Sequence, residues 1–153
     1  MAKVLEDDQN GFAVTYYDQI AAVQLAENKP AEAQRTAAHA RELLGAAKTG
    51  FDNDHLAITE AKIAAALQPE DAKALARSLT RLRELAAQSS KSGFVSLELE
   101  ARLAEGEIEM RGSGAKAGRE HLVRLEQDAA ARGFGLIARQ AATARQVTLA
   151  QQR

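Results

Sequence analysis

The chain has no cysteine, no tryptophan and few aromatic residues of any kind. Its 153 residues include four phenylalanines, two tyrosines and two prolines. Without cysteine there is no disulfide framework, no thiolate nucleophile and no cysteine-based zinc site. The sequence also lacks an uninterrupted apolar run of about 18 residues, and its first ten residues lack the apolar stretch of a signal peptide. We therefore expect a cytoplasmic protein that does not enter a membrane.

An excess of charge of one sign is also missing. The formal net charge is −1, which argues against a nucleic-acid-binding protein that works through bulk positive charge. Hydrophobic residues make up 46% of the chain and recur periodically, which argues against disorder. Sustained alternation of apolar and polar residues, the signal of a strand, is absent. Alanine, leucine, glutamate, arginine and lysine dominate and all favour helix, so the sequence predicts an all-α fold.

Helix-stop signals divide the sequence into seven predicted helices. Pro30 and Pro69 suit the first turn of a helix, and Asp52 or Asn53 suits an N-cap. In the fourth helix, Leu75, Leu79, Leu82 and Leu85 predict one apolar stripe. The predicted helices cover Phe12–Glu27, Ala31–Lys48, Asn53–Gln68, Glu70–Ser89, Phe94–Arg111, Ala115–Arg132 and Phe134–Gln151.

Every phenylalanine follows a glycine, at intervals of 39, 43 and 40 residues. Glycine adopts the left-handed conformation that often ends a helix, and the next residue often makes an apolar contact back onto the last turn. We expect each phenylalanine to fold back in this way, with Phe134 near Ala129, and to start the next helix. The residues that mark the predicted repeat boundaries are Gly11, Phe12, Gly50, Phe51, Gly93, Phe94, Gly133 and Phe134.

A period of about 40 residues built from helix pairs predicts an α-α superhelix, or solenoid. We expect about three antiparallel helix pairs and a C-terminal capping helix in a single domain over residues 11–153. Residues 1–10 are interpreted as a flexible segment or the remnant of an upstream helix. If they are a remnant, we expect the chain to be cut from a longer array. The alternative is a complete short protein with a frayed N-terminus.

The fifth predicted helix carries two apolar faces on opposite sides, as expected for a helix with neighbours on both sides. Met110 is interpreted as flexible core filler, and Gly106 and Gly118 as sites where two helix backbones approach closely. One face comprises Leu97, Ala101, Ala104 and Ile108, and the other comprises Leu99, Leu103, Gly106 and Met110.

The pattern resembles tetratricopeptide (TPR) repeats over residues 12–150. Tyr17, Ile20 and Ala21 match positions of the first repeat helix, and Ala33, Ala37 and Ala40 match positions of the second. The C-terminal part is similar to TPR-like segments of bacterial signalling proteins, including eukaryotic-like Ser/Thr kinases and transcriptional regulators. The resemblance implies a scaffold that binds a protein or peptide on a concave face. It also implies a solvating cap with polar positions Arg139, Gln140, Thr143 and Gln146.

Two charged sets are candidates for contact with a partner. The first set, on the fifth helix, suits a basic partner, and the second, on the fourth helix, suits an acidic peptide. For both sets the leading interpretation is a solvated charged face. The sets are Glu98, Arg102, Glu105 and Glu109, and then Lys73, Arg77 and Arg81.

Signals for chemistry are weak. Glu6, Asp8, Asn10 and Gly11 suggest a calcium loop, but Tyr17 occupies the position of its last acidic ligand. The segment 112–118 has phosphate-loop composition but follows a helix and lacks Gly-Lys-Ser/Thr, so we interpret it as a turn. The three histidines, interpreted as solvated or at the edge of the core, are His39, His55 and His121.

The sequence therefore predicts a non-catalytic protein- or peptide-binding scaffold without a cofactor, part of a larger bacterial signalling or regulatory protein. An alternative is a self-association module with no separate ligand. An enzyme is the third hypothesis. Two carboxylates, or a histidine and a carboxylate, that converge in a pocket from different helices would favour it.

Overall fold

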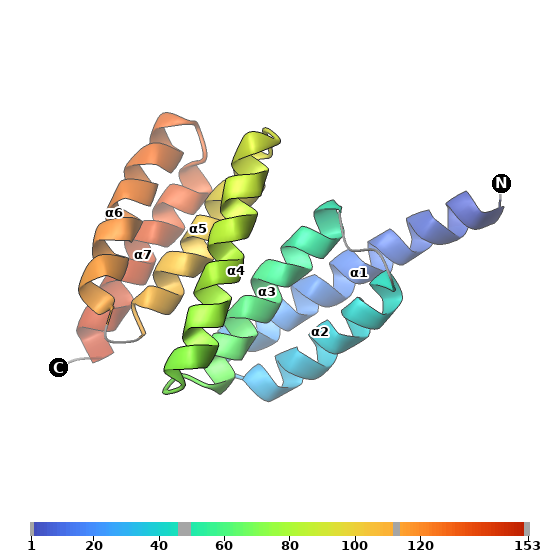
Figure 1. Cartoon of the computed structure of the whole chain (residues 1–153), viewed down its shortest axis with the longest axis horizontal. Coiled ribbons are helices and arrows are strands. Elements are labelled where there is room, and N and C mark those ends of the chain that lie inside the picture. Colours follow the sequence, from blue (N-terminus) through green and yellow to red (C-terminus); the bar gives the residue numbers. More distant parts are fainter. Residues whose placement is uncertain (1, 46–49, 112–113, 152–153) are drawn as a thin grey trace. The chain divides into compact units, whose positions relative to one another are not determined.

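The computed structural model describes residues 2–45, 50–111 and 114–151, and the side chains within those ranges from residue 12 to residue 146. These residues form seven α-helices and no strand, which confirms the all-α prediction (Figure 1). None of the described helices combines the length and apolarity that a membrane crossing requires. The helices are α1 (Ala2–Ala26), α2 (Pro30–Leu44), α3 (Phe51–Leu67), α4 (Ala72–Lys91), α5 (Val95–Glu109), α6 (Ala115–Ala131) and α7 (Gly135–Gln151).

The chain divides into two compact units, Met1–Leu67 and Gln68–Arg153. In the first unit, α1 and α2 pack side by side and α3 packs against both. In the second unit, α5 packs against α4, α6 and α7. The predicted pair of helices over 53–68 and 70–89 is thus divided between the units. A single domain over 11–153 and a superhelical arrangement stay predictions.

The first unit has a core built largely of alanine. Leu56 and Ile63 of α3 supply its larger side chains. Arg41 of α2 adds an ion pair to Glu60 of α3, with 2.8 Å between Nη2 and Oε2. Four alanines that the sequence places within helices are buried in this core, where their small side chains let the helix backbones approach closely. They are Ala21, Ala33, Ala37 and Ala40.

The predicted helix start at Phe12 is wrong. The first helix runs without a break from Ala2 to Ala26, so Gly11 and Phe12 lie inside it. A glycine within a helix costs about 1 kcal/mol relative to alanine, and good helix formers on both sides tolerate that cost. Gly11-Phe12 therefore does not share the role of the later Gly-Phe pairs, and the segment 2–10 is part of α1.

The glycine caps at Gly93 and Gly133 are confirmed. Both residues have positive φ, 77° and 85°. The Phe94 N–H donates to the Ser89 carbonyl at 2.9 Å, and the Phe134 N–H donates to the Ala129 carbonyl at 2.8 Å. Each glycine N–H donates to the carbonyl three residues before it, which completes the Schellman motif at the ends of α4 and α6.

The predicted end of the second helix, near Gly50, is wrong. The helix ends at Leu44, because Gly45 takes the left-handed conformation (φ 62°) five residues earlier. Gly50 also has positive φ, at 129°, but residues 46–49 before it lie outside the described residues. Its carbonyl accepts from the Asp54 N–H at 3.0 Å, so Gly50 opens α3.

The phenylalanine side chains differ more than their shared motif suggests. Phe134 is half-buried against the core of the second unit, a core that includes Ala129, as predicted. Phe51 and Phe94 each remain 55% exposed, and Phe12 is 81% exposed. A backbone motif fixes the turn but does not require its aromatic ring to be covered.

Several local start signals were also assigned to the wrong residue. Asp52 and Asn53 lie inside α3, and Pro69 lies in the turn before α4. Asp71 is the N-cap of α4, since its carboxylate accepts from the N–H groups of Lys73 at 2.8 Å and Ala74 at 3.0 Å. Pro30 begins α2, as predicted.

The predicted leucine stripe of α4 is displaced. Leu82 is fully buried, but the other three leucines are only half-buried. Small residues share the buried line with Leu82, and their size permits close packing without large side chains. That buried line comprises Ala74, Ser78, Leu82, Ala86 and Ser89.

Candidate functional site

The helix α5 is buried on both of its apolar faces, as its sequence predicts. Within the second unit it has α4 on one side and α6 and α7 on the other (Figure 1). Leu99, Leu103 and Met110 join the core formed with α6 and α7, which confirms Met110 as core filler. Leu97 and Ile108 on the opposite face are also buried.

Two glycines bring α5 and α6 close together. A Cβ placed on Gly106 would lie 2.6 Å from Leu122 Cδ2. A Cβ on Gly118 would lie 2.8 Å from the Met110 backbone nitrogen and 2.9 Å from Glu109 Cβ. The predicted close approach of two backbones is therefore confirmed at Gly118, whereas the space beside Gly106 is filled by the Leu122 side chain. Both contacts hold α6 against α5.

The interpretation of that flank as a solvated face is wrong. Glu98 and Glu105 are only 7% and 8% exposed. Arg102 and Glu109 are half-buried. Because a buried charge needs a partner, each of these groups is paired with side chains from other helices.

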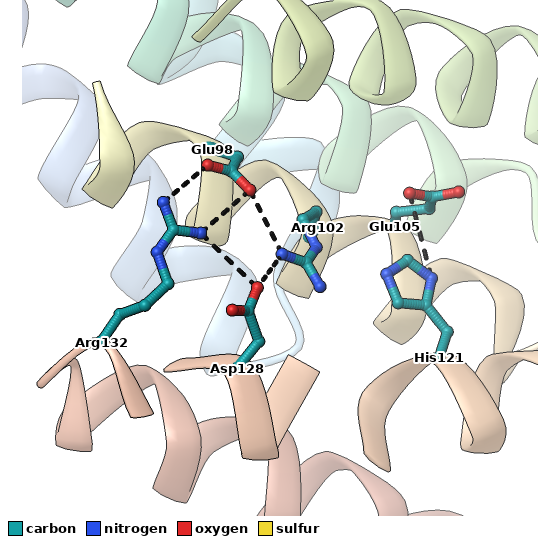
Figure 2. Close-up of polar contacts among 6 residues, drawn as sticks. All are labelled: Glu98, Arg102, Glu105, His121, Asp128 and Arg132. Atoms are coloured by element: carbon teal, nitrogen blue, oxygen red, sulfur yellow. Dashed lines mark hydrogen bonds and ion pairs between the residues drawn. The ribbon is translucent and has the colours of Figure 1, made fainter. Parts of the chain in front are cut away.

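The first group of pairs, the Glu98 cluster, consists of Glu98 and Arg102 of α5 with Asp128 of α6 and Arg132 just beyond its end. Figure 2 shows the two carboxylates between the two guanidinium groups. Arg132 Nη2 donates to Glu98 Oε2 at 3.0 Å, and Arg102 Nη1 donates to Glu98 Oε1 at 3.2 Å. Arg102 also donates to Asp128. Two positive and two negative charges thus balance within the cluster.

This pairing changes the acidity of both carboxyl groups. The hydrogen bonds from Arg132, with a further contribution from Arg102, hold the pKa of Glu98 below its usual value. The hydrogen bond from Arg102 lowers the pKa of Asp128 in the same way. Glu98 therefore stays ionised despite its burial, and it is a structural charge rather than a proton donor.

The second group, the His121 cluster, consists of Arg83 of α4, Glu105 and Glu109 of α5, and His121 of α6. Arg83 donates to Oε1 of both carboxylates, at 2.8 Å for Glu109. His121 Nδ1 lies 3.3 Å from Glu109 Oε2 and 3.9 Å from Glu105 Oε2. Figure 2 shows His121 directed from α6 toward Glu105. His121 is half-buried, as expected for a histidine at the edge of the core, but it also meets two carboxylates from α5 that the sequence did not predict as its neighbours.

The His121 cluster has the donor types of a metal site. The donor atoms of Glu105, Glu109 and His121 lie within 4.8 Å of one another. Ligands of a tetrahedral zinc ion are about 3.3 Å apart, which the His121–Glu109 distance meets. However, Arg83 already supplies a cation to both carboxylates. We therefore assign the cluster a structural role, in which Arg83 provides the positive charge beside the two carboxylates.

The same three residues bear on the enzyme hypothesis. A histidine and two carboxylates converge from different helices, but both carboxylates already form ion pairs with Arg83. One shallow depression on the described surface, on α4, contains none of these groups. Its lining residues are Ala76, Arg77, Thr80, Arg81 and Glu84. The arrangement holds charges together, and the depression on α4 is lined by other side chains.

The basic set on α4 is exposed, in contrast to the acidic set on α5. Lys73, Arg77 and Arg81 all face solvent, and Arg77 and Arg81 line the depression. Their role toward an acidic peptide stays a prediction. For the α5 set the predicted partner role also stays a prediction, but the pairs described above already use those charges within the chain.

The remaining sequence candidates are located as follows. His39 stacks edge-on against Tyr17, with 4.6 Å between ring centroids, and His55 lies 4.3 Å from the Phe51 ring. The segment 2–11, which holds the residues of the suggested calcium loop, is helical. In the predicted turn at 112–118, residues 112–113 lie outside the described residues and Ala115 begins α6. The polar positions of α7 are exposed, as a capping helix requires: Arg139, Gln140, Thr143 and Gln146.

The other feature of note is an exposed face of α1 that carries no charge, here called the uncharged face. Three large side chains stand on it: Phe12 is 81% exposed, Tyr16 62% and Val23 57%. Asp18, the acidic residue within this stretch, is buried. The exposed residues of α1 between 12 and 26 are Phe12, Thr15, Tyr16, Gln19, Ala22, Val23 and Ala26.

This face is continuous along the helix. At 100° per residue the seven side chains fall within about a third of the helix circumference, with Gln19 at the centre. At one edge, Thr15 Oγ1 donates to Asp52 of α3 at 3.1 Å. The sequence analysis did not identify this face. The helical spacing of the uncharged residues on α1 could have indicated it.

Comparison with protein-family models, with curated proteins and with solved structures finds no significant match to this chain.

Proposed function

We propose that this chain is a non-catalytic protein-interaction module, and that it docks through the uncharged face of α1. The observation that carries the proposal is the exposure of Phe12, Tyr16 and Val23 along one side of a single helix. Isolated exposed apolar residues are common, but a contiguous stripe marks an interaction surface. The TPR-like superhelix and a place in a bacterial signalling protein belong to the same proposal and rest on the resemblance described above.

The composition of the face defines the chemistry of the partner. Charged residues make up 27% of the chain, yet none is exposed on this side of α1 between Phe12 and Ala26. Aromatic residues at the centre of an interface contribute strongly, since they bury a large area and lose few rotamers. The fitting partner is an amphipathic helix with an apolar stripe at positions three and four apart, laid along α1.

The internal charges support the same conclusion. The Glu98 and His121 clusters use the charged flank of α5 within the chain, so that flank has a structural role. In the first unit, Arg41 is likewise paired to Glu60. None of these ion pairs involves α1, so docking on α1 leaves them intact.

Photo-crosslinking in the host cell tests the proposal. A photoreactive phenylalanine analogue at Val23, on the face, is compared with the same analogue at Arg35, which is exposed on α2. We expect a discrete adduct from position 23 that Tyr16→Asp abolishes, and none from position 35. Crosslinked-peptide mass spectrometry then identifies the residues joined. Equal labelling at both positions, or an adduct that survives Tyr16→Asp, would contradict docking through this face.

A further inference from the structure

The uncharged face is complementary to itself, and we infer that its occupant is the α1 helix of a second copy of this chain, laid antiparallel about Gln19. This inference rests on the proposed docking function and names the partner. It depends on the order of residues along the face as well as on its exposure.

The side chains at one end of the face are large and those at the other end are small, which suits an antiparallel arrangement of two copies. Phe12 and Tyr16 stand at the N-terminal end, and Ala22 and Ala26 at the C-terminal end. Rotation by 180° about an axis through Gln19 sets Phe12 of one copy opposite Ala26 of the other. The same rotation sets Tyr16 opposite Ala22. Large side chains then meet small ones at both ends, as the packing of two helices requires.

A two-fold interface uses the same surface on both copies, so a charge close to the axis meets an identical charge from the other copy. Like charges held together across an interface cost several kcal/mol. The uncharged face avoids this cost completely, since Gln19 and its six companions carry no charge. At the axis itself, two glutamine side chains can donate and accept hydrogen bonds to each other.

The size of the face sets the expected strength. From Phe12 to Ala26 the helix rises about 21 Å, or four turns. A contact of that length lies at or below the low end of specific protein interfaces. We therefore expect a dimer in exchange with monomer, with a dissociation constant in the micromolar range or weaker.

Sedimentation equilibrium over micromolar to high-micromolar concentrations tests the inference with paired charge variants. Gln19→Glu and Gln19→Lys each place two like charges on the axis. Each alone should weaken the dimer about tenfold or more. An equimolar mixture of the two should restore association, because the charges are then opposite. The matched control is Gln34→Glu, at an exposed position on α2, which should leave the dimer unchanged.

The outcomes separate this inference from the proposed function. A wild-type chain that stays monomeric at every concentration overturns the dimer, as does a failure of the mixture to restore association. If the chain is monomeric and the Val23 adduct contains a different protein, docking through α1 stands and only the second copy is rejected. If the adduct is missing as well, both are rejected. Far-ultraviolet circular dichroism of each variant verifies that its helices are intact.

Discussion

The helices α5 and α1 use charge in opposite ways. Of the 15 residues of α5, six are charged, yet Glu98 and Glu105 are buried and paired. On α1 between Phe12 and Ala26 the exposed residues are all uncharged. A charged pattern on a helix thus does not establish solvent exposure, and an apolar pattern does not establish burial. The neighbouring helices decide the difference. The helix α6 covers the charged flank of α5, whereas α2 and α3 pack against the other side of α1 and leave this face exposed.

The close approach of α6 to α5 is the feature whose loss should have the largest effect. In Gly118→Ala the new methyl group would lie 2.8 Å from the Met110 backbone nitrogen, which cannot move by rotating a side chain. We expect a net loss of about 2 kcal/mol in the free energy of unfolding, despite the gain in helix propensity. Chemical denaturation measures it.

Two further glycine variants sharpen this prediction. Gly106→Ala meets the Leu122 side chain, which can adjust, so its cost should be smaller than that of Gly118→Ala. Gly135→Ala, at the start of α7, finds its nearest atom at 3.8 Å and should leave stability unchanged or slightly raised. A neutral Gly118→Ala would contradict the helix contact that pairs the charges of α5.

Removal of the cation of the His121 cluster should have the next largest effect. Arg83→Met leaves Glu105 and Glu109 close together without the guanidinium that joins them. Because Arg83 is more than half exposed, we expect a loss of only about 1 kcal/mol. Lys116→Met, at an exposed position on α6, is the control and should cost less.

The same variant tests the structural assignment of that cluster. Without Arg83, the donors of Glu105, Glu109 and His121 are free to accept a metal ion, so Zn²⁺ should raise the melting temperature of Arg83→Met and not that of the wild type. His121→Asn added to Arg83→Met should remove the effect. A zinc-dependent increase in the wild type would show instead that the cluster binds metal beside its arginine.

The smallest expected effect is on the pH dependence of stability. The pKa values of Glu98 and Asp128 are lower in the folded chain than in the unfolded chain, where they are about 4.3 and 3.9. Their contribution is therefore complete above those unfolded values and is lost as the pH falls through the folded values. Melting temperatures between pH 7 and pH 2.5 should decrease less steeply for Glu98→Gln/Asp128→Asn than for the wild type. Glu120→Gln, at an exposed position, should follow the wild-type curve.

Much of the fold could be predicted from the sequence, because its signals are local. Helix-stop signals located the seven helices that the described residues form, and the glycine caps at Gly93 and Gly133 follow from backbone conformation alone. The errors at Gly11 and Gly45 arose because a glycine can either continue a helix or end one, and only its surroundings decide. The two-faced pattern of α5 correctly predicted neighbours on both sides.

The polar clusters could not be predicted in the same way, because their partners are distant in sequence. Arg132 is 34 residues from Glu98, and their meeting depends on the register of α6 against α5. Gly106 and Gly118 hint at that register, since each marks a close contact between the two helices. Once the register of α6 against α5 is known, Asp128 and Arg132 can be identified as partners of the α5 charges.

The most direct measurement of the central claim, that α1 docks on its own copy, uses the absence of cysteine. Gln19→Cys introduces a single thiol at the centre of the uncharged face, and Gln34→Cys introduces one at an exposed position on α2. Under mild oxidation we predict rapid formation of a disulfide-linked dimer for Gln19→Cys and little for Gln34→Cys, measured on non-reducing gels. Equal and slow dimer formation by the two variants would contradict the antiparallel pairing of α1.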